Sequence, residues 1–445
     1  MQMIYPLPKR SLSTLSIGIT TGVLGVLFDI SFAALIFSNS LSDYLSAGIG
    51  FVLFSAAAAR IMVALMSSFP GMVSDLAAIP TAILSWSTGM VVREMPTTAT
   101  PEELLITVIV TIALTSLLTG LFLWTLGELK LGNIVRFLPH SVVGGFMASS
   151  GLLLIKGAGD ILFKQPLNTL SFQSFSQSLF QPESFMQWLP GLLLALHLVI
   201  VTRKQRNSVV MAVRLVGAIA LFYITLALLG ISVTQANTQG LTLGIPSLQT
   251  TWQVLSWSNL LQINWRAIGS QWMCSGTVSA LTAVLLLMNM KGMEVAIDQD
   301  IDINYELKVA GSANGLLGMG GGILAVHSMG GSILVHTLGG RSRWVTITGA
   351  ATFIVMPLIF SNWLTYFPTT ILGGLLLYLG LSCLYEWVFR ARKKLSRLDY
   401  CIVQLIWVVS GIVGFLQALA LGWAIAVGLL LHQLATKKWQ QSGNV

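Results

Sequence analysis

Long uncharged stretches separated by short polar segments run through the whole of this chain. Each stretch lasts about 20 residues, the length that an α-helix needs to cross roughly 30 Å of hydrocarbon. Alternating apolar and polar positions over about ten residues, the sign of membrane-spanning strands, are absent. The pattern predicts an all-α polytopic membrane protein with fourteen spans, at residues 14–38, 44–67, 72–90, 104–128, 139–160, 187–202, 208–231, 274–296, 306–325, 327–339, 343–361, 367–388, 399–414 and 416–435.

The positions of the basic residues are consistent with this count. With the N-terminus in the cytoplasm and the spans alternating in direction, most of the 24 Lys and Arg residues fall on the cytoplasmic side, as membrane insertion requires. Residues 1–13 and 436–445 are then the two cytoplasmic ends of the chain. Three basic residues instead fall within predicted spans: Arg60, Arg214 and Lys291.

Two of the predicted spans are short and irregular. The third contains Pro80 and follows Pro70 and Gly71, and the tenth lies in a glycine-rich stretch, residues 318–340. A broken span frees backbone groups, which is tolerated only against protein or a cavity. Seven spans in each half give an inverted repeat, and transporters of that kind bind ions at two broken helices. We therefore expect half-helices at spans 3 and 10 with a binding site between them, and a helix break near His327.

Composition excludes several classes of protein. The chain is 55% hydrophobic and 9% charged, so it is not a soluble protein. Its net charge of +8 reflects membrane orientation, and we expect no nucleic-acid partner. We find no nucleophile and base at useful spacing, no phosphate loop and no metal-ligand cluster, so we expect neither an enzyme nor a bound cofactor or metal.

Two acidic residues within spans are the first candidates for function. Asp29 is deep in the first span, where a charge is costly; it either bonds free backbone amides or acts on the solute. Asp75 follows the Pro70–Gly71 turn, so it either caps the third half-helix or contacts substrate. Carboxylates at these places oppose the positive field of the helix ends. They suit a cation or a transferable proton, and both are candidates for substrate and coupling-ion binding.

The tenth span supplies the other candidates. His327 stands at the expected break, as a packing histidine or as a binding and proton-relay group. The remaining substrate-binding candidates are Ser74, Ser328, Met329 and Ser332; the last two serines share a helix face and either bind solute or allow close packing. Near the cytoplasmic end of the eighth span, Asn289 and Glu294 are further coupling-ion candidates. Lys291 and Glu294 at i and i+3 also predict a local ion pair at the interface.

Two strings carry a resemblance to a known family. Residues 131–146 read LGNIVRFLPHSVVGGF, in which Arg136 marks the cytoplasmic edge and Pro139 starts a helix. Gly144 and Gly145 allow another helix to approach closely. The second string consists of Glu306, Leu307, Gly311, Ala313 and Asn314, followed by Gly321 and Gly322. Together they resemble signatures of the SulP family of anion transporters. The resemblance covers residues 14–435 and implies a core bundle of spans 1–4 and 8–11 and a gate bundle of spans 5–7 and 12–14.

The sequence also departs from the pattern of that family. Phe28 and Asp29 stand where many members have a Pro-Gln pair, and residues 73–77 replace a Ser-Val-Gly-Pro-like string. Residues 327–332 replace a serine-rich start of the tenth span, and Asn289 stands near the usual carboxylate of the eighth. The C-terminal STAS domain of the family is not expected in a tail of this length. These departures place acidic groups at a site that normally holds anions.

The resemblance implies a secondary active transporter that works by alternating access. Its default substrate is an inorganic or small organic anion, with coupling to H⁺ or Na⁺. The acidic residues favour an alternative, a proton-coupled carrier of a cationic solute such as a basic amino acid. A second alternative is a structural or voltage-responsive membrane protein that transports nothing. The expected partners are the lipid bilayer, a small ionic substrate and, as in many family members, a second copy of the chain.

Overall fold

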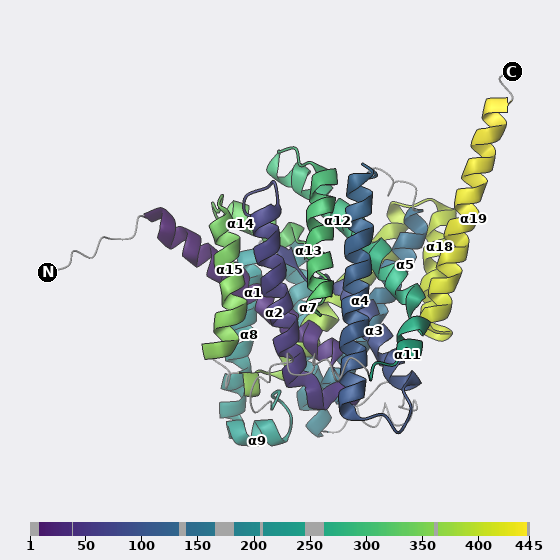
Figure 1. Ribbon diagram of the computed structural model, residues 1–445. Helices are drawn as coiled ribbons and strands as arrows, with labels where there is room; N and C mark the ends of the chain where they lie inside the picture. The colour runs from purple at the N-terminus through teal and green to yellow at the C-terminus, as the bar shows by residue number, and fades with distance from the viewer. Residues whose placement is uncertain are drawn as a thin grey trace.

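A computed structural model describes residues 9–37, 39–132, 139–164, 182–204, 208–244, 262–359 and 364–442 of the chain. Nearly all of this is helix, and most helices lie roughly side by side (Figure 1). The first half contains α1 (Lys9–Ile36), η1 (Asn39–Tyr44), α2 (Leu45–Met66), β1 (Ser74–Asp75), α3 (Ala78–Glu94), α4 (Pro101–Glu128), α5 (His140–Phe163), α7 (Pro182–Lys204), α8 (Ser208–Leu228) and α9 (Val233–Thr238).

The second half repeats this alternation of long helices with one broken span. Its elements are α11 (Trp265–Ser270), α12 (Trp272–Ile297), α13 (Ile303–Met319), β2 (Val326–His327), α14 (Met329–Thr337), α15 (Arg343–Ile359), α17 (Thr369–Leu384), η5 (Tyr385–Arg390), η6 (Ala391–Lys393), α18 (Arg397–Ile412) and α19 (Phe415–Ser442).

A helix occupies most of each predicted span. Within the described ranges, eight helical segments are long and apolar enough to cross a membrane unaided. The predicted class, a helical multi-pass membrane protein, is therefore confirmed, while the count of fourteen spans stays a prediction. Among the described α-helices that occupy predicted spans, the shortest is α14, in the tenth span.

Glycines bring α4 and α13 into backbone contact. A Cβ atom added at Gly311 would lie 2.4 Å from the backbone nitrogen of Trp124, and one at Gly120 would lie 2.3 Å from that of Gly315. Only glycine permits such an approach, which membrane helices use because lipid gives no hydrophobic drive to associate. Helix α13, which carries the second of the two family-like strings, is thus fixed against α4.

A second set of helices packs around α5. The predicted close approach at Gly144 and Gly145 is confirmed: added Cβ atoms would lie 2.9 Å from the Trp387 ring and 2.8 Å from Ile406. Helix α17 crosses α5 where Gly380 lies against the carbonyl of Gly151. Helices α17 and α18 therefore hold α5 on two sides. Arg136 lies outside the described residues.

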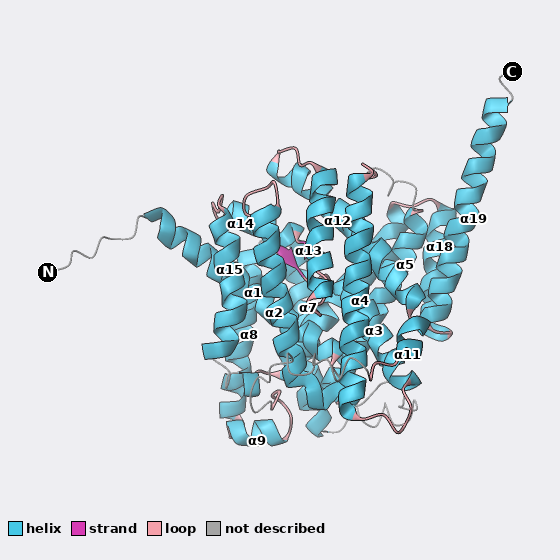
Figure 2. Ribbon diagram, in the orientation of Figure 1, coloured by secondary structure: helices cyan, strands magenta, loops and turns pink. Residues whose placement is uncertain are grey.

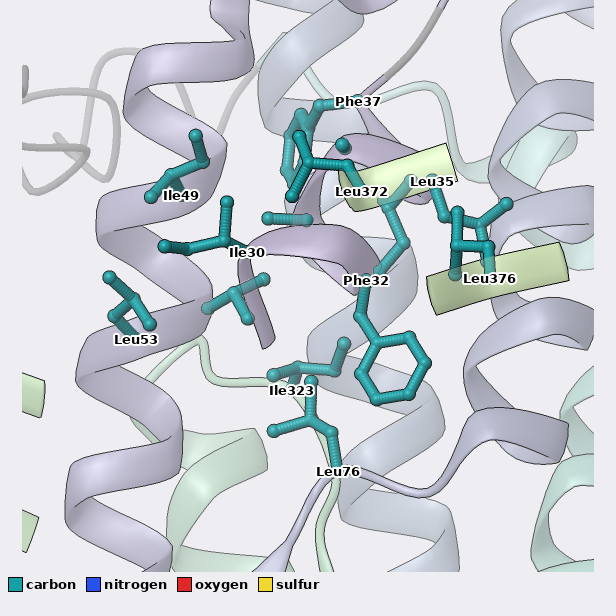
Figure 3. Close-up of a cluster of buried hydrophobic side chains, with 14 of the residues drawn as sticks. Ile30, Phe32, Leu35, Phe37, Ile49, Leu53, Leu76, Ile323, Leu372 and Leu376 are labelled. Carbon is teal, nitrogen blue, oxygen red and sulfur yellow. The ribbon is translucent and has the colours of Figure 1, made fainter. Parts of the chain in front are cut away.

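Helix α1 joins the two sets of helices. Figure 3 shows Ile30 beside Ile49 and Leu53 of α2, while Leu35 lies against Leu376 of α17. The end of α1 is thus anchored by apolar packing on both sides, and Asp29 precedes this anchored turn.

Candidate functional site

The two broken spans meet in a short antiparallel strand pair among the helices, the magenta element in Figure 2. Ser74 pairs with His327 and Asp75 with Val326, and the amide of Ser328 donates to the carbonyl of Val73 at 2.8 Å. Backbone groups freed by each break are thereby satisfied by the other break. The predicted helix break near His327 and the predicted meeting of spans 3 and 10 are both confirmed.

Side chains fasten this strand pair to its surroundings. The Asn314 amide donates to the carbonyl of Ala325 and accepts from its N–H, both at 2.8 Å. The Ser332 hydroxyl accepts from the N–H of Val73 at 2.9 Å, and the Ser328 hydroxyl caps α14 by accepting from Gly331 at 3.1 Å. The hydroxyls of Ser328 and Ser332, two of the three candidate serines, therefore both accept a hydrogen bond from the backbone.

Asp75 is paired with a residue that sequence reasoning missed. Arg60 of α2 donates from Nε to Oδ1 of Asp75 at 3.0 Å, and Nη2 contacts the same oxygen. The expectation that Asp75 caps α3 is wrong, because the N-cap residue is Ala77, which makes no side-chain capping bond. Asp75 lies two residues earlier, in extended backbone, where its carboxylate reaches Arg60.

The guanidinium of Arg60 is enclosed in a notch between α1 and α15. The side chain is 1% exposed, and its Cζ lies 4.4 Å from the centre of the Phe353 ring. An added Cβ atom at Gly25 would lie 2.3 Å from one terminal nitrogen, so the notch requires glycine there, and one at Gly349 would lie in tight contact at 3.3 Å from the other. Arg60 therefore reaches Asp75 from the side of α1 and α15, where protein surrounds it. A cation–π contact with Phe353 stabilises its guanidinium there.

The other oxygen of Asp75 faces α14. Its side chain is 24% exposed, and a Cβ atom at Gly331 would lie 3.2 Å from Oδ2. Asp29 is fully buried on α1, its Oδ2 has no partner among the described residues, and it interacts electrostatically with Asp75 and Arg60. Asp29 and Arg60 thus both interact electrostatically with Asp75, whose second oxygen faces the first turn of α14.

A second buried pair joins the strand β2 to α13. His327 Nε2 is 2.9 Å from Oε2 of Glu306, and both side chains are 0% exposed. Oε1 of Glu306 accepts from Ser68 N–H at 2.9 Å, from Ser68 Oγ at 2.6 Å and from Ser67 Oγ at 3.1 Å. This pair ties α13 to the end of α2. His327 consequently has no open path to a solute in this conformation.

The remaining candidates, Asn289, Met329 and Glu294, contact other parts of the structure than Asp75. Asn289 donates to the carbonyl of His327 at 2.8 Å and so supports β2, while the Met329 side chain packs against Gly292 of α12. The predicted local ion pair is confirmed, with Lys291 Nζ 2.7 Å from Glu294. Glu294 also accepts from the N–H of Ile301. Within the described ranges, no group of three His, Cys, Asp or Glu side chains is arranged to hold a metal ion.

Comparison with known proteins gives one family and a consistent fold. The sulfate permease family profile matches residues 12–406. A curated relative, the vacuolar basic amino acid transporter VSB1 of Saccharomyces cerevisiae, is 24% identical over 353 residues. The match covers 77% of this chain and 34% of the relative, so the chain spans about a third of the length of that protein.

Solved structures show the same architecture. The transmembrane domain of a cyanobacterium bicarbonate transporter, BicA, superimposes with a TM-score of 0.62 at 19% identity, covering 93% of this chain and 97% of that one. SLC26A9 gives 0.70 at 15% identity over 95% of this chain and 66% of that one. Murine SLC26A9 in the inward-facing state gives 0.66 at 16% identity, over 98% and 70%. At these identities the likeness concerns the fold.

Proposed function

Since the chain belongs to the sulfate permease family, whose members are transporters and not enzymes, we propose that it carries a basic amino acid across the membrane in exchange for protons. The observation that carries this proposal is the grouping of Asp29, Asp75 and Arg60 beside the two half-helices. Two carboxylates against one guanidinium leave one negative charge for the solute.

The half-helices supply the opposite polarity. The first amides of α3 have no side-chain cap, and Gly330 in the first turn of α14 has open space where a side chain would be. Helix N-termini attract anions. A basic amino acid has an α-carboxylate for these amides and cationic groups for Asp75 and Asp29, so it matches both signs of charge at this site.

Similarity supports the same class of substrate. The yeast relative is a basic amino acid transporter by name, and the match extends over most of this chain. The relative is longer than this chain, so we take its substrate as support and rest the proposal on the charges of the site.

Asp29 is our choice for the coupling proton. Its Oδ2 has no partner within the part of the chain that the structure describes, and it is fully buried, whereas Asp75 already shares its charge with Arg60. A proton on Asp29 neutralises the surplus negative charge when no cationic solute is bound. The proton and the cationic solute then neutralise the carboxylate of Asp29 in turn, so that the movement of one is coupled to the movement of the other.

We further propose that alternating access moves the helices around α4, α12 and α13 against those around α5 and α17, with both termini in the cytoplasm. A homodimer fits this arrangement too. The first set holds the broken spans and therefore the solute, and the second provides the surface past which the solute moves.

A small anion is the second candidate. The buried guanidinium of Arg60 and the two helix ends favour it, because together they offer positive charge. For that function Asp75 would only hold Arg60 in place, and neutralising Asp29 would leave transport intact or improve it. The two candidates therefore differ in what Asp29→Asn does.

Uptake by purified protein in proteoliposomes tests these candidates. We expect saturable uptake of labelled arginine or lysine driven by a proton gradient, and little uptake of sulfate or bicarbonate. Asp29→Asn and Asp75→Asn should abolish the proton-driven uptake. Asp43→Asn is the matched control, because Asp43 is an exposed aspartate in η1.

Two outcomes would contradict the proposal. Uptake of an inorganic anion without uptake of arginine or lysine would favour the second candidate. No uptake of any solute by protein with an intact melting transition would favour a membrane protein that does not transport.

A further inference from the structure

A groove of about 1010 Å³ runs along the membrane-facing side of α7 and α8, and none of the candidate site residues lines it. Its walls are largely aliphatic, with Leu193 and Ile200 on α7 facing Val213 and Leu221 on α8. These four side chains are between 56% and 66% exposed. Helices in a membrane bury such surface against lipid or protein, so the groove is a place for an apolar occupant.

Gly217 deepens the groove in its middle. A Cβ atom there would meet nothing within 4 Å, although glycine is a poor helix former and α8 gains nothing from it by packing. The helices α7 and α8 are therefore separated by open space at this level. Along α7 the groove extends from Phe185 to Ile200, which is about 22 Å of helix.

One end of the groove holds an unbalanced cation. Nη1 of Arg214 lies 2.6 Å from Nε2 of His197, and across the described chain no carboxylate lies within ion-pair distance of this guanidinium. Arg214 is six residues into α8, about 9 Å from its start at Ser208. A charge at this depth is expensive unless it meets an opposite charge or reaches the headgroup layer.

We propose that this groove is a binding site for an anionic phospholipid. The phosphate bonds to Arg214 and His197 at one end, and an acyl chain lies along α7 past Gly217 toward Phe185. One leaflet makes up about half of a hydrocarbon layer of about 30 Å. The groove is longer than that half, so it accommodates a full acyl chain. Anionic headgroups supply the charge that the protein lacks there.

A second copy of the chain is a less suitable occupant. No acidic residue occurs between Leu189 and Leu228, so the same surface of another copy brings no anion to Arg214. Symmetric pairing would instead bring cations and aliphatic side chains together. Charge complementarity therefore selects the lipid.

Binding can be measured without any transport assay. Purified protein is titrated with phosphatidylglycerol or phosphatidylcholine, followed by native mass spectrometry and by thermal melting in nanodiscs of each lipid. We expect retained phosphatidylglycerol and a melting temperature about 2–4 °C higher with it than with phosphatidylcholine. Arg214→Gln should remove the lipid preference. Gly217→Phe should displace the acyl chain by filling the open space around this position, where an added Cβ atom meets nothing within 4 Å.

Two controls separate this site from general effects. Arg266→Gln removes an exposed arginine on α11, and Gly428→Phe adds the same ring on α19, where a Cβ also meets nothing within 4 Å. Both should keep the preference for phosphatidylglycerol. Equal responses of Arg214→Gln and wild-type protein would overturn the proposal. So would a change from dimer to monomer on Gly217→Phe with lipid binding unaltered, since that result assigns the groove to a second copy.

Discussion

Arg60 is the side chain on which the polarity of the site depends. It donates to one oxygen of Asp75 and leaves the other toward α14. Arg60→Ala leaves the half-buried carboxylate of Asp75 without its partner, which destabilises the site, and releases Asp75 from its orientation. We expect uptake to fall by about ten- to a hundredfold.

The glycine notch makes this prediction testable by chemical rescue. Gly25 and Gly349 leave a guanidinium-shaped space once the Arg60 side chain is gone. Millimolar guanidinium should restore part of the uptake in Arg60→Ala, while urea, which has a similar shape and no charge, should not. If guanidinium and urea act alike, Arg60 does not orient Asp75 by its charge.

Asn314 is a second residue with a defined task. Its side-chain amide forms hydrogen bonds with both the N–H and the C=O of Ala325, which a hydrocarbon side chain cannot do. Asn314→Leu has similar volume but orphans two buried backbone groups, each costing about 1–3 kcal/mol. We expect a large drop in melting temperature. Asn304→Leu, which loses one bond to Gly132 nearer the surface, should cost less.

Sequence could place individual polar residues within spans but could not pair them. Asp29 was predicted from the cost of a charge in a membrane, Asp75 from its place after a Pro-Gly turn, and His327 from its place at the expected helix break. Arg60 and Glu306 were identified in spans or motifs, yet their partners lie in the strand pair, 15 and 21 residues away. Hydropathy fixes how deep a residue lies and not which way it faces, so cross-helix pairs remained hidden.

At the level of elements, α13 and α4 depend on glycine at particular turns. Gly311 lies against the backbone of Trp124, while Gly315 one turn later has open space around its own Cβ direction. Gly311→Ala should push the helices apart and lower the melting temperature strongly. Gly315→Ala should be neutral or stabilise by up to about 1 kcal/mol through helix propensity. Equal melting temperatures for the two variants would contradict close packing at Gly311.

The broken elements were more predictable than their contact. Glycine, proline and short length located spans 3 and 10, because each feature disfavours a continuous helix. The strand pair between Ser74 and His327 was not predicted, since two residues of extended chain have no periodicity. Its cause is general: freed backbone groups in a membrane need partners, and the other break supplies them.

For the whole molecule, hydropathy and basic residues predicted the class and the order of helices because both follow from insertion into lipid. Grouping of the helices into moving bodies is a different property, which depends on packing across the sequence. Trp423 of α19 donates to Thr277 of α12 at 3.0 Å, across the boundary between the two proposed bodies. Thr115 of α4 and Ser275 of α12 lie 2.9 Å apart within one of them.

These two contacts predict opposite effects of cross-linking on transport. In a background with Cys274, Cys383 and Cys401 replaced by serine, Thr277→Cys with Trp423→Cys, joined by a short bifunctional thiol reagent, should stop uptake, and reduction should restore it. Thr115→Cys with Ser275→Cys should cross-link without loss of uptake, since both helices move together. Full uptake in the first cross-linked protein would show that the two bodies do not move against each other, because alternating access requires that motion to expose the site to each side in turn.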